Sequence, residues 1–74
     1  MKVETVLLEN NKEYAIINKV LLNNKMYAYL VNINNYKDFC IRIIKSLNNG
    51  YQILRLDNEK EYMLALKELT KKNN

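Results

Sequence analysis

The sequence predicts an α+β fold: an antiparallel β-meander of about five strands, curved or barrel-like, with a C-terminal α-helix packed on it. Two observations predict this fold. Asparagine pairs recur at positions 10–11, 23–24, 34–35 and 48–49, and the segments between them are rich in Val, Ile, Leu and Tyr. After residue 56, the spacing of apolar residues changes from the period of a strand to that of a helix. A chain of 74 residues has room for a single domain, which we place at residues 1–74.

The asparagine pairs are interpreted as turns. Asparagine tolerates positive φ better than any residue except glycine, so these pairs fit the two-residue turns of β-hairpins. The predicted strands span residues 3–9, 12–22, 25–33, 39–47 and 51–56. Short connections make each strand antiparallel to its neighbour. The third connection, "NINNYKD", is the longest and least regular, and we expect it to be a mobile loop.

The last segment predicts a helix over residues 58–72. Asp57 or Asn58 can cap its N-terminus; with Asn58 as the cap, Glu61 stands three positions later, as in a capping box. An apolar stripe recurs at spacings of three and four, formed by Tyr62, Ala65, Leu66 and Leu69. A helix of about this length is marginal alone, so the stripe is expected to pack on the sheet.

The strands are apolar on both faces, which a meander covered by a single helix does not require. Either strong twist curls the sheet towards a small barrel, or the second face is an interaction surface. Tyrosine is enriched in protein interfaces, so the candidate protein interface consists of Tyr27, Tyr29, Val31 and Tyr51. The alternative is that these residues form ordinary cross-strand pairs. The sequence leaves both questions open.

The net charge of +4 raises the possibility of nucleic-acid binding. The charges are interspersed, whereas affinity for nucleic acid depends on neutralising several adjacent phosphates together. Candidate contacts are Lys25, Arg42, Lys45 and Arg55, near tyrosines that could stack on bases. Nucleic acid is therefore an alternative partner, ranked below protein.

The residues that most enzymes use are missing. The chain has no histidine, one glycine (Gly50) and one cysteine (Cys40), which lies between apolar residues of a predicted strand. The acids of "LDNEKEY" fit a helix start and match neither a calcium loop nor a two-metal site. We expect no catalytic residue, no cofactor, no metal and no small-molecule substrate.

The sequence also bears on location and partners. It contains no apolar run long enough to cross a bilayer, its start does not resemble a signal peptide, and its single cysteine suits a reducing compartment. We expect a cytoplasmic protein. Its richness in Asn, Lys and Ile is typical of an AT-rich bacterial, phage or plasmid genome. The expected role is a protein-interaction module that binds a partner or itself; a phage- or plasmid-encoded inhibitor of a host enzyme is a second possibility.

The segments "NNKEYAIINKVLLNNKMYAYLV" and "FCIRIIKSLNNGYQILRLDNEKEYMLALKEL" resemble the YrzB-like family of small uncharacterised bacterial proteins. Asn24, Lys25, Tyr27 and Leu30 match its "G-K-x-Y-x-x-L" signature, with Asn in place of Gly. Asp57, Glu61 and Tyr62 resemble its "D-x-x-E-F/Y" helix start, with one additional residue between the two acids. The resemblance spans nearly the whole chain and implies the fold described above. It implies no catalytic residue, and this chain departs from the family in being basic.

Overall fold

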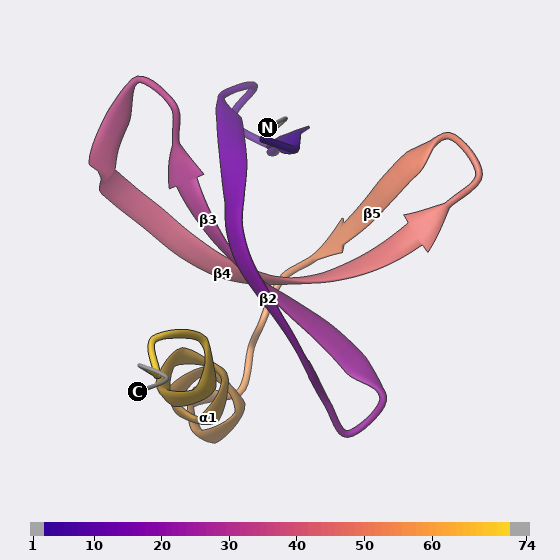
Figure 1. Cartoon of the computed structure of the whole chain (residues 1–74), viewed down its shortest axis with the longest axis vertical. Coiled ribbons are helices and arrows are strands. Elements are labelled where there is room, and N and C mark those ends of the chain that lie inside the picture. The colour runs from indigo at the N-terminus through magenta and orange to yellow at the C-terminus, as the bar shows by residue number, and fades with distance from the viewer. Residues whose placement is uncertain (1–2, 72–74) are drawn as a thin grey trace.

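The computed structural model describes residues 3–71 as one five-stranded sheet and one helix (Figure 1). Every strand pairs antiparallel with its neighbour in the chain, so the order in the sheet is β1-β2-β3-β4-β5. The predicted α+β meander with a C-terminal helix is therefore confirmed. The elements are β1 (Thr5–Leu7), β2 (Glu13–Leu22), β3 (Lys25–Asn32), β4 (Asn35–Leu47), β5 (Gly50–Leu54) and α1 (Glu59–Leu69).

All four asparagine pairs lie at or next to a reversal of the chain. Between β2 and β3, Asn23 and Asn24 both adopt positive φ, 51° and 65°, as the favoured two-residue hairpin turn requires. Asn11 has φ 62° in the first turn. In the last hairpin the positive φ, 143°, belongs to Gly50 and not to the asparagines before it. Glycine has no Cβ to clash in this conformation, so the asparagines there can stay in ordinary conformations.

The third connection is shorter than the sequence predicted. β4 begins at Asn35 and not at residue 39, which leaves a tight turn in place of the expected irregular loop. The asparagine side chains explain the difference, because they accept hydrogen bonds from the turn's own backbone. Asn32 Oδ1 accepts from the Asn34 amide at 2.8 Å, and Asn35 Oδ1 accepts from the Lys37 amide at 3.2 Å. The register of β3 and β4 shifts at Asn32, which absorbs the extra residues.

The sheet curls into a nearly closed barrel and buries apolar side chains on both faces. Side chains alternate across a strand, so consecutive residues of β3 belong to two cores. The barrel core lies on the inner face and contains Val6, Leu8, Tyr14, Ala28, Leu30 and Ile44. The helix core lies under α1 and contains Tyr27, Ile41, Ile43, Ala65 and Leu69. Figure 1 shows α1 on one side of the crossing strands and β1 and β5 on the other.

The helix is anchored at both ends. Asn58 Oδ1 accepts a hydrogen bond from the Glu61 amide at 3.1 Å, so Asn58, and not Asp57, is the N-cap of the two predicted. At the other end, Asn18 Nδ2 of β2 donates to the Leu69 carbonyl at 3.0 Å. The helix ends at Leu69, earlier than predicted, and the predicted last residue, 72, lies outside the described residues. Among residues 3–71, α1 is too short and too polar to span a membrane.

Candidate protein-binding surface

The helix covers only part of its face of the sheet. The register places Thr5, Ala15, Val31 and Phe39 in one row across β1 to β4, on the same face as the helix core. Next to this row, towards α1, Tyr29 lies opposite Ile41. Ile41 is buried under α1, whereas Phe39, two residues earlier on the same strand, keeps 46% of its surface exposed. The edge of the helix contact therefore falls between these two residues.

The uncovered part of this face carries a group of exposed or half-buried apolar side chains. Its members come from four strands and the turn after β3: Leu7, Ile17, Tyr29, Val31, Ile33 and Phe39. We call this group the apolar strip. Leu7 and Ile17 are 63% and 59% exposed, so the strip is open to solvent. Contiguous apolar surface of this kind usually marks a site of interaction, whereas single exposed hydrophobic residues do not.

Two aromatic rings at the strip's centre, those of Tyr29 and Phe39, pack against each other in the folded protein. The Tyr29 and Phe39 rings are stacked, with centroids 5.5 Å apart and planes 12° from parallel. They extend from adjacent strands, which fixes their spacing. A partner that binds them therefore meets rigid aromatic area and does not have to order it first.

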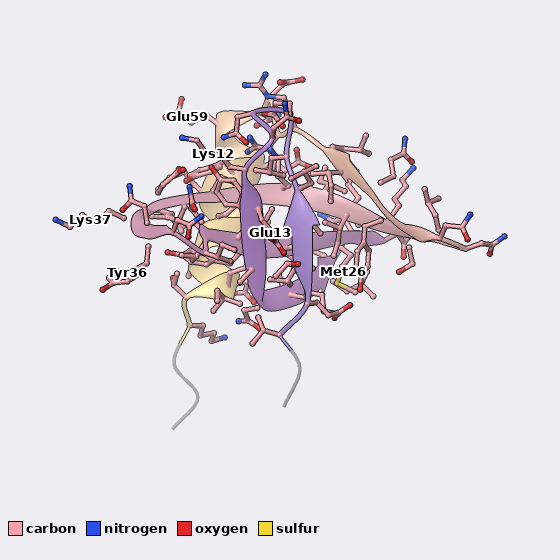
Figure 2. The ribbon with its side chains drawn as sticks, turned by 90° about the horizontal axis from the view of Figure 1, so that it is seen from above. Lys12, Glu13, Met26, Tyr36, Lys37 and Glu59 are labelled. Carbon is pink, nitrogen blue, oxygen red and sulfur yellow. The ribbon has the colours of Figure 1, made fainter. Side chains whose placement is uncertain are left out.

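A hollow of about 480 Å³ adjoins one end of the strip. Leu7 and Ile33 of the strip line it, together with Asn11, Lys12, Glu13, Asn32, Asn34 and Asn35. Figure 2 shows Tyr36 and Lys37 pointing away from the molecule beyond the turn between β3 and β4. Tyr36 is 84% exposed. The strip thus passes into a polar rim at the hollow.

The structure brings together two of the four residues predicted as an interface, Tyr29 and Val31. Tyr27 was predicted wrongly, because it is 3% exposed and lies under α1. Its hydroxyl donates to Glu61, and burial, assisted by this bond, raises the pKa of Tyr27 to about 12. Tyr51 does not lie beside the other tyrosines. It packs against the barrel core, and its hydroxyl donates to Glu4.

The predicted nucleic-acid contacts do not form one surface. Lys25 lies on the helix side and forms an ion pair with Glu61, with 3.2 Å between Nζ and Oε2. Arg42 is half-buried near the other core and pairs with Glu9 at 3.2 Å. Arg55, in the loop after β5, is exposed and lies close enough to Glu9 to interact with it, as Arg42 does, whereas Lys45 is exposed on β4. Two of these four cations are already paired with carboxylates, and Glu9 lies near both arginines, so little unpaired charge is concentrated for phosphate binding.

A half-buried polar cluster connects the turns at the hollow. The Tyr14 hydroxyl donates to Asp38 Oδ2 at 2.6 Å, and Asn32 Nδ2 donates to the same oxygen at 3.2 Å. The Tyr14 bond, with that of Asn32, holds the pKa of Asp38 below its usual value. Asn10 Nδ2 reaches the Tyr14 hydroxyl at 3.2 Å. These bonds connect the turn before β2 to the start of β4 and so fix the rim of the strip.

Burial raises the pKa of the Cys40 thiol, which disfavours the reactive thiolate. Within the part of the chain that the structure describes, no group of three or more Cys, Asp or Glu side chains could hold a metal ion. A second hollow, of about 360 Å³, lies beside the start of α1 and is lined by residues such as Lys25, Tyr27 and Leu64. It lies apart from the strip.

Sequence reasoning missed Phe39 and Ile17 as members of this surface. Phe39 lies on the same side of β4 as Ile41, as alternation along a strand requires, but the sequence gave no sign that the helix stops short of it. Ile17 is the additional residue of a β-bulge between Ile16 and Asn18, which breaks the strict alternation that the prediction used. Comparisons of the chain with protein-family models, curated proteins and solved structures found no match.

Proposed function

We propose that the protein is a small, non-enzymatic module of the cytoplasm that binds another protein through the apolar strip. The observation that carries the proposal is the stacked pair of Tyr29 and Phe39 at the centre of an uncovered apolar sheet face. Interfaces between proteins combine an apolar, aromatic centre with a polar rim. The strip has this organisation, with Thr5, Glu13 and Lys37 around it.

The form of the interaction is also part of the proposal. A module that covers a surface of a host enzyme, as a phage or plasmid inhibitor does, needs a binding face and no catalytic group of its own. The resemblance to the YrzB-like family is compatible with this role and supplies no partner. Among the described residues, the structure adds no observation in favour of nucleic-acid binding to the cations that the sequence already shows.

Replacement of Phe39 by serine tests the proposed function. The variant removes one of the two stacked rings, and because Phe39 is half exposed, we expect a loss of only about 1 kcal/mol of stability. Binding to a protein recovered with the wild-type chain should weaken by at least about thirtyfold, as at an aromatic interface centre. The measurement is titration of each variant with the purified partner, after circular dichroism has confirmed the fold.

Leu47→Ser is the matched control. Leu47 is 57% exposed at the end of β4, beside the turn to β5 and away from the strip. This variant should bind as the wild type does. Equal binding by Phe39→Ser and the wild type would refute the strip as the binding surface.

A further inference from the structure

We infer that β1 is a strap that opens separately from the rest of the sheet, and that two carboxylates fasten it, one before the strand and one after it. β1 contains three residues and pairs only with β2. Val6 of this strand and Leu8, the residue after it, belong to the barrel core. In the nearly closed barrel, β1 is the edge strand at one end of the sheet and β5 the edge strand at the other.

Side chains, and not a backbone ladder, connect β1 to the far side of the barrel. Before the strand, Glu4 accepts a hydrogen bond from the Tyr51 hydroxyl of β5 and pairs with Lys19 of β2 at 3.5 Å. After the strand, Glu9 pairs with Arg42 of β4 at 3.2 Å. Glu4 and Glu9 are therefore fasteners at the two ends of the strap. Their side chains are 51% and 57% exposed, so water competes for these bonds.

Local opening needs few bonds to break. Towards β2, the bonds flanking the strand include the Ile16 amide to the Glu4 carbonyl at 2.8 Å and the Leu8 amide to the Lys12 carbonyl at 3.1 Å. A three-residue edge strand held by few hydrogen bonds belongs to the least stable part of a protein. The rest of the barrel keeps its ladders from β2 to β5 when β1 leaves. Opening uncovers Tyr14 and the barrel core beneath it.

The fasteners also respond to acid. The groups that face Glu4 are Tyr51 and Lys19, and those that face Glu9 are Arg42 and Arg55. The hydrogen bond from Tyr51 lowers the pKa of Glu4. The pKa of Glu9 is also lowered, mainly by a hydrogen bond from its own backbone and in addition by Arg42. A carboxylate with a lowered pKa binds protons more tightly when released, so falling pH favours the open strap.

Amide hydrogen exchange with a Glu4→Ala/Glu9→Ala variant tests the inference. The Leu8 and Ile16 amides should exchange roughly fivefold faster than in the wild type, because both bonds break when β1 opens. The Ile33 amide, which donates to the Glu13 carbonyl at 3.2 Å on the other side of β2, should change less than about twofold. Glu68→Ala, which removes a half-buried carboxylate of α1, is the control and should leave all three amides unchanged.

Two outcomes overturn the inference. Equal acceleration at Leu8, Ile16 and Ile33 means that β1 opens only with the whole molecule. No acceleration at Leu8 and Ile16 means that the two carboxylates do not fasten it. If the double variant fails to fold, Tyr51→Phe provides the same comparison, since it removes one hydroxyl bond to Glu4 and leaves the strand sequence intact.

Discussion

Replacement of Leu30 by alanine is expected to cost about 3 kcal/mol of folding free energy. Leu30 is fully buried, with 0% exposure, at the centre of the barrel core. Its removal leaves a cavity among Tyr14, Ala28 and Ile44, which belong to curled strands that cannot close in fully. A domain of this size has a total stability of about 4–10 kcal/mol, so the loss is a large fraction of it. Urea unfolding followed by circular dichroism measures the change.

Leu47→Ala is the control for this prediction. It removes the same side-chain atoms from a residue that is 57% exposed, so its cost should stay below about 0.5 kcal/mol. Similar costs at both positions would mean that the barrel core is not the centre of stability that the burial indicates.

Replacement of Ala65 by glutamate is expected to release α1 from the sheet and to cost more than about 3 kcal/mol. Ala65 is 0% exposed and packs in the helix core with Tyr27, Ile41 and Ile43. Neither the volume nor the charge of glutamate fits there, and no cation of that core is available to pair with it. Circular dichroism should show loss of helix signal together with a lowered unfolding midpoint.

Met63→Glu on the same helix is the control. It places a glutamate in α1 outside the helix core, so it separates the loss of packing on the sheet from any effect of glutamate on helix propensity. Met63 is 56% exposed, so a charge there remains in water. Its unfolding midpoint should stay close to that of the wild type. A stable Ala65→Glu variant with full helix content would show that α1 does not depend on this contact.

The fold was predictable because local signals agreed with one another. Asn23 and Asn24 adopt the conformations that a hairpin turn requires, and Asn58 caps α1 as its position indicates. The irregular third connection was mispredicted for a physical reason. The sequence shows Asn32 and Asn35, but not that their side chains bond to the turn's backbone and let β4 begin early.

The surface was predictable only in part, since it depends on where the helix comes to lie. Alternation correctly places Tyr27 and Tyr29 on one side of β3, yet it cannot show that α1 buries the first ring and leaves the second half-buried at the edge of the helix core. That boundary depends on the loop after β5 and on the hydrogen bond from Asn18 to Leu69. Asn18 and Leu69 are separated by most of the chain, so the sequence gives no local sign of their contact. Tyr51 was misplaced because register, and not residue type, determines the face.

The central claim is that part of the helix-side sheet face, the apolar strip, stays uncovered in the folded chain. Nuclear magnetic resonance with a soluble gadolinium chelate measures this directly, because the chelate accelerates the relaxation of protons near solvent. The account predicts strong acceleration for Phe39, Ile17 and Leu7 side chains and weak acceleration for Leu30 and Ile41, which are at most 1% exposed. Protection of Phe39 and Ile17 as complete as that of Ile41, in a dilute monomer, would contradict it.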